Sequence, residues 1–494
     1  MKLLKTIFFA AAMAVSPLIA AEELVILHTN DTHSVIMPNS KGIGGWFRHK
    51  AIIDSVRAAN KNVIVVDAGD AVQGSVYYNL YHGEVEYKLK EMMGYDYAIL
   101  GNHDFDYKDS VLVQMLEDSR LKWLSSNYFF KNEVLASKFA PYDIREVEGK
   151  RIAFMAINIE PDGLIIDENC KMVGYLDATK TAQLTSQYLK ECLRADIVVA
   201  LTHIGHKESK NSADDYRLRD NCPYIDIIIG GHSHHEETPD EEWQKLGEKA
   251  LYAQAYKYGF KMGQFTIDLD KMKVKHHLYT VDSRYDKYPK DEAMAELLRP
   301  YEHGVDSVMH LYISNVRKNM EIEEPELGNF LADFIYYRAQ QLSDKKVDFA
   351  ILNKGSIRQP WIAGKLSEGD VMVAQPFCNF VTVQEVSGDS IASCFAFMSQ
   401  NGGQCVSKNV DVKMNADNSG YEYVKIDGKR IDPNKTYRLA TINYVATGGD
   451  KFTMLKAFPI VARSENFVDR DIINYIKENY PKEIKTSSKQ RMHY

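Results

Sequence analysis

The sequence predicts an α/β protein of two domains. In the first half, short apolar runs typical of buried strands alternate with helical stretches at 46–59 and 177–194. Continuous apolar strands between helices indicate a sheet covered on both faces. A chain of 494 residues is too long for one hydrophobic core. Polar clusters follow five of the runs, and α/β folds gather functional groups beyond the carboxyl ends of their strands.

The clusters consist of residues that bind metals or move protons. Asp31 and His33 are alternate residues of a segment expected to be extended, so their side chains would share one face. His232 and His234 repeat this spacing. The run at 151–156 lacks such a cluster, whereas the runs at 24–27, 62–66, 98–100, 197–201 and 225–229 are followed by His28–His33, Asp67–Asp70, Gly101–Asp106, Thr202–Gly205 and Gly230–His234.

These donors indicate a metal site. Asn and Asp are also ordinary turn residues after a strand, but their recurrence with His at five strand ends argues against turns alone. Imidazole and carboxylate donors without Cys suit borderline cations such as Zn²⁺ or Mn²⁺. Asp70, at a central strand end, can bridge two cations roughly 3.5–4 Å apart, the geometry of metal-assisted phosphate hydrolysis.

The amino terminus is typical of an exported protein. Lysines at 2 and 5, an apolar stretch over 6–20 and small residues at 20–21 predict a signal peptide at 1–21. We therefore expect a periplasmic, extracellular or cell-surface protein, with an uncleaved amino-terminal anchor as the alternative. No later apolar stretch has membrane length, so no transmembrane span is expected after the signal is removed.

Composition narrows the partners further. The sequence is 45% hydrophobic and 26% charged, as in soluble globular proteins. Its net charge of -8 and lack of a basic tract argue against binding a nucleic-acid polymer. Export makes the six cysteines disulfide candidates. Pairs within one domain are favoured, with free buried thiols as the alternative; the close candidates are Cys192 with Cys222 and Cys394 with Cys405.

The second half begins after a connector. Residues 291–315 have the spacing of an amphipathic helix despite Pro300, and we interpret them as the link between domains. A helical run at 330–342 and a strand at 349–352 follow, and then mixed strands and turns.

The strand-end motifs resemble those of a known superfamily. Asp31-Thr-His33, Gly69-Asp70, Gly101-Asn-His-Asp104, Thr202-His203 and Gly231-His-Ser-His234 are similar to the five motifs of the metallophosphoesterase, or calcineurin-like, superfamily. The likeness to its 5′-nucleotidase family extends over nearly the whole mature chain. It implies a four-layer metallophosphoesterase α/β sandwich at 22–285, a linker helix at 286–320 and a C-terminal α+β substrate-binding domain at 321–494.

The resemblance assigns roles to the first half. It implies two divalent metal ions, one held by Asp31, His33, Asp70 and His234, and the other by Asp70, Asn102, His203 and His232. The family often has Gln or Asn where His234 stands. His103, paired with Asp106, would stabilise the transition state or protonate the leaving group. Water activated between the metals would be the nucleophile.

The resemblance also implies a nucleotide pocket in the second half. Three segments that build the nucleoside pocket in the family have counterparts here, at Asn353–Arg358, Gln375–Asn379 and Asn443–Asp450. Asn353 and Asn379 would be among the substrate-binding residues. Phe377 and Tyr444 would stack on the base, Asp450 would accept from the ribose, and Arg358 would meet the phosphate. Glu321 stands where relatives carry an Arg, and Lys354, where relatives carry Gly, could supply the missing cation.

The function implied is an exported dimetal hydrolase that removes phosphate from nucleoside 5′-monophosphates, acting as a monomer on a small-molecule nucleotide. Two alternatives use the same machinery: a 2′,3′-cyclic-nucleotide 2′-phosphodiesterase with 3′-nucleotidase activity, and a nucleotide-sugar hydrolase. A binding protein without turnover is a third. A complete hydrolytic set argues against the binder, because binding needs the aromatic clamp alone.

Overall fold

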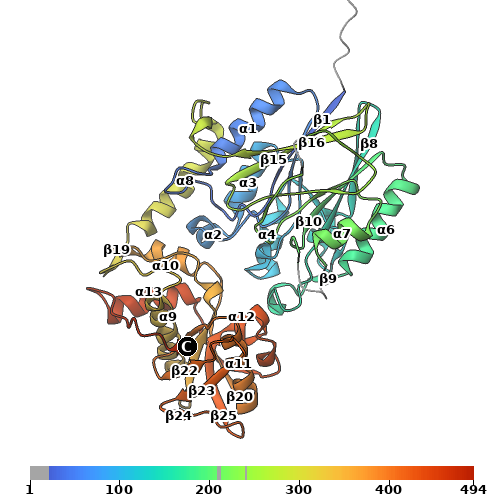
Figure 1. The fold of residues 1–494 in the computed structure, drawn as a ribbon. Coiled ribbons are helices and arrows are strands. Elements are labelled where there is room, and N and C mark those ends of the chain that lie inside the picture. The colour runs from blue at the N-terminus through green and yellow to red at the C-terminus, as the bar shows by residue number, and fades with distance from the viewer. Residues whose placement is uncertain (1–21, 208–212, 240–241) are drawn as a thin grey trace, which may run out of the picture.

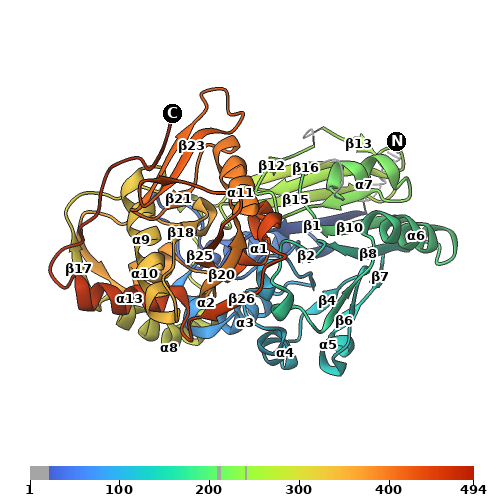
Figure 2. The ribbon, with the colours of Figure 1, turned by 90° about the horizontal axis from the view of Figure 1, so that it is seen from below.

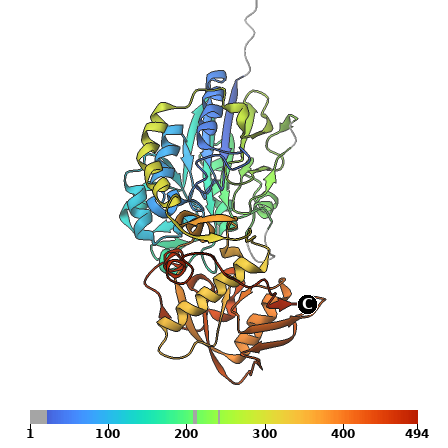
Figure 3. The ribbon, with the colours of Figure 1, turned by 90° about the vertical axis from the view of Figure 1, so that its left-hand side faces the viewer.

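A computed structural model describes residues 22–207, 213–239 and 242–494, and the predicted signal peptide lies outside the described residues. The chain forms two domains, drawn one above the other in Figures 1 and 3. Helix α8 (Glu292–Met309) runs along one side between them. None of the helices in the described residues has the length and apolar character needed to cross a membrane.

Two sheets form the centre of the N-terminal domain within the described residues. The first is ordered β13 (Gln244–Lys245), β16 (Lys273–Thr280), β15 (Lys261–Asp268), β1 (Glu23–Thr29), β2 (Val63–Asp67), β3 (Tyr97–Ala98), β4 (Lys122–Leu124), β6 (Phe139–Ala140). The second is ordered β12 (Glu236–Glu237), β14 (Leu251–Ala255), β11 (Ile227–Ile229), β10 (Ile197–His203), β8 (Lys150–Asn158), β7 (Tyr142–Val147). Strands β1, β2 and β3 run parallel, as do β8, β10 and β11.

Side-chain alternation along the strands builds four layers. Ile26 and Val66 of the first sheet pack with Phe154 and Val199 of the second, so one core lies between the sheets. The alternate residues, such as Leu27, pack under helices on the outer face. The helices that cover the two outer faces are α1 (Trp46–Ala59), α3 (Glu84–Met93) and α4 (Asp109–Glu117) on one side, and α6 (Ala178–Glu191) and α7 (Asp215–Asn221) on the other. The predicted sandwich is confirmed.

The C-terminal domain is α+β, also as predicted. Its main sheet, seen in Figure 2, is ordered β21 (Cys405–Val406), β18 (Phe349–Leu352), β25 (Thr436–Ile442), β20 (Val381–Ser387), β26 (Ile460–Arg463). A smaller sheet is ordered β24 (Lys429–Arg430), β23 (Tyr421–Ile426), β22 (Val410–Met414), β27 (Met492–His493). Around them lie α9 (Pro325–Leu342), α10 (Glu368–Ala374), α11 (Gly388–Gln400), α12 (Asn443–Ala446) and α13 (Val468–Asn479).

The connector differs from its prediction. The helix predicted over 291–315 ends at Met309, and Tyr312–Val316 forms strand β17. This strand pairs with β19 (Gly364–Ser367), a partner distant in sequence that a local helical pattern cannot reveal. Helix α9, in contrast, begins before the predicted run, with Pro325 in its first turn. The domain boundaries at 285 and 320 stay predictions.

The cysteines also differ from the favoured prediction. All six are free, and neither the pair Cys192 with Cys222 nor the pair Cys394 with Cys405 is formed. Cys394 packs in the core of the C-terminal domain, where burial raises its pKa to about 12. A buried thiol of this kind behaves as a small apolar side chain.

Candidate active site

Parallel strands bring the predicted metal ligands to one edge of the N-terminal domain. Asp31 follows β1 and Asp70 follows β2, while His203 is the last residue of β10 and His232 follows β11. The side chains of Asp31, Asp70 and His203 are almost fully buried. Strand ends from both sheets therefore converge on one point.

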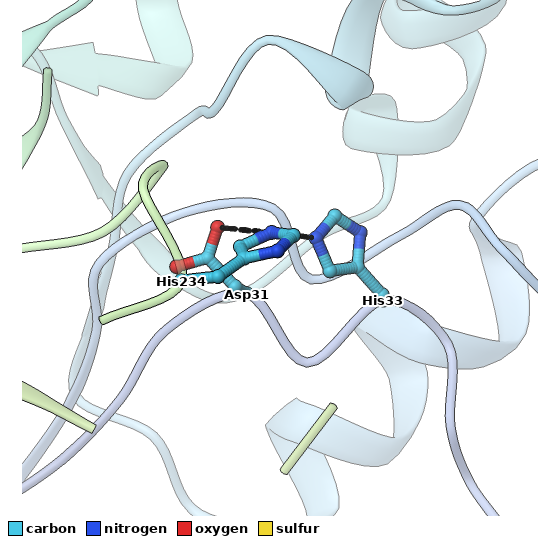
Figure 4. A group of neighbouring side chains, drawn as sticks. All are labelled: Asp31, His33 and His234. Carbon is cyan, nitrogen blue, oxygen red and sulfur yellow. Dashed lines mark hydrogen bonds and ion pairs between the residues drawn. The ribbon is translucent and has the colours of Figure 1, made fainter. Parts of the chain in front are cut away.

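The first group of donors comprises Asp31, His33 and His234, whose ligand atoms lie within 4.8 Å of one another. The two imidazole Nε2 atoms are 2.9 Å apart, and His234 Nε2 is 3.4 Å from Asp31 Oδ1. Figure 4 shows the His234 ring between the carboxylate and the His33 ring. Such spacings suit neighbouring donors around one cation with bonds of about 2.0–2.2 Å to each.

The second group comprises Asp31, Asp70 and His203. His203 Nδ1 donates to the Ala68 carbonyl at 2.8 Å, which leaves Nε2 3.1 Å from Asp70 Oδ2. That Nε2 is buried and makes no hydrogen bond of normal geometry. Burial lowers the pKa of His203, but Asp70 outweighs it and raises the pKa to about 10. The buried carboxylates therefore attract positive charge to this point, which a metal ion would supply.

Asn102 and His232 lie beside the second group. Asn102 Oδ1 is 2.8 Å from His232 Nδ1, and the His232 backbone N–H donates to both carboxylate oxygens of Asp31 at 3.1 and 3.0 Å. A Cβ at Gly231 would stand 2.7 Å from His203 Nδ1, so glycine permits this close approach. The structure thus gathers all seven predicted ligands around one centre.

The predicted extended geometry of the ligand pairs is wrong. Asp31, His33, His232 and His234 all have left-handed backbone, with φ of 47°, 45°, 76° and 57°, and Asp70 has φ 52°. Hydrogen bonds between the loops, including His33 N–H to the Asp70 carbonyl at 3.1 Å, hold this conformation. Left-handed non-glycine residues cost free energy and cluster at functional sites. The loops therefore fix these donors more tightly than strand alternation would.

His103 stands at the open side of the donor groups. Its Nδ1 lies 3.1 Å from both oxygens of Asp106, and its backbone N–H donates to Asp70 Oδ1 at 2.8 Å. Burial lowers the pKa of His103, but the charges of Asp106 and Asp70 outweigh burial and raise it. The carboxylate thus fixes the ring and favours its protonated form.

A cavity of about 330 Å³ lies between the two domains. On the N-terminal side the lining includes His103, Asp106 and several of the metal-ligand candidates; on the C-terminal side it includes Asn353, Arg358, Phe377, Asn379, Tyr444 and Asp450. Asn353 Nδ2 donates to Asp450 Oδ2 at 2.7 Å. The Arg358 guanidinium lies 5.0 Å from the Phe377 ring centre. Donors of the first domain and aromatic rings of the second therefore share one space.

Two charged residues singled out in the sequence lie elsewhere. Among the described residues, Lys354 and Glu321 are not part of the cavity lining. The Lys354 backbone N–H donates to Gln404 at 2.7 Å, and Glu321 accepts from Asn319 at 3.2 Å.

The sequence did not reveal one wall of the cavity. Leu164, Ile165, Ile166 and Asn169, between β8 and β9 (Val173–Tyr175), line it. Asn169 Nδ2 donates to the backbone carbonyls of Phe105 at 3.0 Å and Asp106 at 2.9 Å. These residues follow no strand end and form no motif, so no local signal marks them.

Comparison with known proteins agrees with this architecture. A calcineurin-like phosphoesterase model matches residues 24–236, and a 5′-nucleotidase C-terminal domain model matches residues 305–457. The protein UshA of Yersinia enterocolitica is 27% identical over 519 residues, covering 93% of this chain and 92% of that protein. The 5′-nucleotidase of Vibrio vulnificus is 26% identical over 511 residues, covering 93% and 91%.

A solved structure also matches along both domains. The crystal structure of a 5′-nucleotidase precursor from Thermus thermophilus has a TM-score of 0.79 at 25% identity, covering 95% of this chain and 99% of that chain. The chain therefore belongs to the 5′-nucleotidase family, in which a calcineurin-like phosphoesterase domain precedes a 5′-nucleotidase C-terminal domain, and it is a metal-dependent phosphoric monoester hydrolase.

Proposed function

We propose that the protein is an exported nucleotidase that removes phosphate from nucleoside 5′-monophosphates. One observation carries this proposal: a single cavity is lined by candidate metal ligands and His103 on one side and by Phe377, Tyr444 and Asp450 on the other. Its volume of about 330 Å³ lies at the lower end of the range for small-molecule sites. Hydrolytic groups and an aromatic pocket in one space fit a nucleotide better than a simple phosphate ester.

The donor set fits two divalent cations, Zn²⁺ or Mn²⁺. We assign Asp31, His33, Asp70 and His234 to one cation, and Asp70, Asn102, His203 and His232 to the other. The buried His203 Nε2, which no normal hydrogen bond satisfies, and the clustered carboxylates support this assignment. When bound, such cations activate water and neutralise phosphate charge.

The residues around the donors perform the remaining steps. Asp106 orients His103 through Nδ1 and stabilises its protonated form. The ring can then give a proton to the leaving ester oxygen from Nε2. Arg358 pairs with a non-bridging phosphate oxygen, to which its planar guanidinium is matched. No side chain needs to form a covalent bond to phosphorus.

The C-terminal wall selects the nucleoside. Phe377 and Tyr444 offer aromatic faces to the base, and stacking of this kind tolerates any base. The Asp450 carboxylate, already held by Asn353, accepts hydrogen bonds from the ribose hydroxyls. Asn379 completes this side of the lining.

Export to the periplasm follows from the predicted signal peptide at 1–21. We further propose that the mature protein acts as a monomer, because one chain provides both walls of the cavity.

A substrate panel tests the proposal. The mature chain, loaded with Zn²⁺ or Mn²⁺, is assayed with 5′-, 3′- and 2′,3′-cyclic nucleotides and with a nucleotide sugar. We expect the highest kcat/KM for a 5′-monophosphate, loss of activity with a chelator and recovery on adding metal. Faster cleavage of the cyclic nucleotide would support the phosphodiesterase alternative. Binding without turnover would support a binding protein.

A further inference from the structure

A buried ion pair lies behind the metal-ligand candidates. Lys90 of α3 and Asp67, the last residue of β2, are each 1% exposed, and Lys90 Nζ is 2.6 Å from Asp67 Oδ2. The ammonium also stands over two aromatic rings, 4.4 Å from the centre of Tyr95 and 5.1 Å from that of Trp46. Removing two charges from water costs free energy that their attraction often fails to recover, so a buried pair is weak evidence for stability. The contacts of Asp67 indicate what the pair does instead.

The Asp67 carboxylate joins three segments of the chain. Its Oδ2 accepts from Thr29 Oγ1, at the end of β1, at 2.6 Å as well as from Lys90. Its Oδ1 accepts from the backbone N–H of Gly69, in the turn after β2, at 3.2 Å. Thr29 is held in turn by the Tyr95 hydroxyl, 2.9 Å away. Lys90 therefore fixes, from α3, the orientation of a carboxylate that shapes the turn after β2.

That turn orients three of the metal-ligand candidates. The Ala68 carbonyl accepts from His203 Nδ1 at 2.8 Å, which leaves the His203 Nε2 facing Asp70. The Gly69 carbonyl accepts from the Asp31 N–H at 2.9 Å, and Asp70 is the next residue of the turn. The turn is also tightly packed, because a Cβ on Gly69 would stand 2.7 Å from His203 Nδ1. A small shift of the turn would thus disturb all three donors at once.

We propose that Lys90 is a positioning residue for the metal site. Acting through Asp67, it holds the turn in the conformation in which the three ligand candidates bind metal. The inference rests on the metal assignment in the proposed function and deepens it. Within the described residues neither Lys90 nor Asp67 lines the cavity, so the effect on the site is indirect. The pair serves metal affinity rather than the stability of the fold, and replacing it should separate these two properties.

The first test replaces the whole pair. Lys90→Met/Asp67→Leu removes both buried charges at similar volume, and such replacements are often neutral or stabilising. We expect the thermal unfolding midpoint of the metal-free protein to stay at or above that of the wild type. The dissociation constant for Mn²⁺, measured by titration with electron paramagnetic resonance, should rise about 10- to 100-fold, the usual loss when a residue that orients a metal ligand is changed.

A second variant isolates Lys90. In Lys90→Met/Asp67→Asn the amide oxygen can still accept from the Gly69 N–H, so the turn keeps its acceptor and loses its anchor to α3. We expect Mn²⁺ to bind about 3- to 10-fold more weakly than in the wild type, the size of one lost hydrogen bond. Both double variants leave the net charge of the pair at zero. A change in affinity therefore reports the geometry of the turn rather than the charge near the metals.

Another Lys–Asp pair of the same domain is the matched control. Lys190 Nζ is 2.7 Å from Asp226 Oδ2, and Asp226 also accepts from the backbone N–H of Val198 at 2.7 Å. Asp226 precedes β11 and Val198 lies near the start of β10, whereas His203 ends β10, so this pair stands at the opposite edge of the sheet. Lys190→Met/Asp226→Leu should leave the affinity for Mn²⁺ unchanged.

Two outcomes overturn the proposal. Wild-type affinity for Mn²⁺ in Lys90→Met/Asp67→Asn would mean that the metal site does not need the anchor. A loss of affinity in Lys90→Met/Asp67→Leu that accompanies a lower unfolding midpoint, and that Lys190→Met/Asp226→Leu shares, would mean that the pair only supports the fold. The readout is metal binding and does not depend on the substrate. A preference for cyclic nucleotides would refute the nucleotidase proposal, while the Mn²⁺ titrations would still decide the role of Lys90.

Discussion

The two walls of the cavity differ in how their residues are held. On the phosphoesterase wall Asp31, Asp70 and His203 are buried, and the backbone of Asp31 and Asp70 is locked in left-handed conformations by hydrogen bonds between loops. On the C-terminal wall Phe377 and Tyr444 are only partly buried, and both line the cavity. The first arrangement suits charged groups that must stay in place, and the second suits a ligand that comes and goes.

This difference predicts different kinetic effects. Changes to the metal-ligand candidates of the phosphoesterase wall should lower metal content and kcat for every phosphate ester, whereas changes to its other residues should lower kcat alone. Changes to Phe377, Tyr444 and Asp450 on the C-terminal wall should raise KM, and only for substrates that carry a nucleoside. A variant on one wall that produced the kinetic effect expected for the other wall would show that the two walls do not act separately.

The largest expected effect is at Asp70, the carboxylate assigned to both cations. Asp70→Ala should lower kcat/KM by about 10⁴-fold or more, because several kcal/mol of charge stabilisation disappear with the metals. Elemental analysis of the purified protein should show loss of bound metal. The control is Asp54→Ala, which removes an exposed carboxylate paired with Lys50. Wild-type metal content in Asp70→Ala would contradict the assignment.

The next effect is at His103, and it separates proton transfer from metal binding. His103→Ala should lower kcat about 10²–10³-fold, the usual contribution of a general acid, with unchanged metal content. Asp106→Asn should reduce kcat less, because the ring remains but loses the carboxylate that orients it. The loss should shrink for an ester with a better leaving group, such as p-nitrophenyl phosphate, since that group needs less protonation. An equal loss for nucleotide and chromogenic ester would contradict a role as the acid.

On the opposite wall, Phe377→Ala and Tyr444→Ala should each raise KM for a nucleoside monophosphate about 10- to 100-fold, because a stacked base contributes roughly 1–3 kcal/mol. KM for p-nitrophenyl phosphate should stay near the wild-type value. Phe129→Ala, at an exposed ring outside the cavity lining, is the control. If both substrates lost affinity equally, the rings would be packing elements of the domain rather than a base pocket.

The sequence revealed the phosphoesterase wall more completely than the rest. Its donors follow strands directly, so chain order and strand topology together bring Asp70 and His203 to one edge. Their backbone was not predictable, because the left-handed turn at Asp31 depends on a hydrogen bond to the Gly69 carbonyl in another loop. The end of α8 at Met309 was missed for the same reason, since β17 exists through its pairing with β19.

The sequence did not indicate the residues whose positions depend only on long-range contacts. Tyr258 follows no motif, and only the fold sets its ring beside His33 and His234. The favoured disulfides failed similarly: short separation in sequence did not bring Cys394 and Cys405 into a bond. Motifs therefore reveal the donor groups and the segments of the nucleoside pocket, whereas a residue outside any motif, such as Asn169, is found only from the tertiary structure.

The smallest expected effect tests whether the loop between β8 and β9, which carries Asn169, supports the phosphoesterase wall. Asn169→Ala removes two hydrogen bonds to the Phe105 and Asp106 carbonyls, each contributing about 0.5–1.5 kcal/mol. Because these bonds fix the segment that carries His103, we expect kcat to fall about 5- to 10-fold, with KM for nucleotides unchanged. Asn221→Ala removes a similar exposed amide bond, to the Arg217 carbonyl, and should change neither constant.

The comparison of kcat with KM decides the role of Asn169, because this residue lines the cavity and also holds the segment that carries His103. If Asn169→Ala raised KM and left kcat intact, the amide would belong to substrate recognition, and the boundary between the two walls would run through this loop. If Asn169→Ala lowered kcat by the same factor in the wild type and in the His103→Ala variant, the two residues would act independently. A loss that disappears in the His103→Ala background would show that Asn169 works through the imidazole.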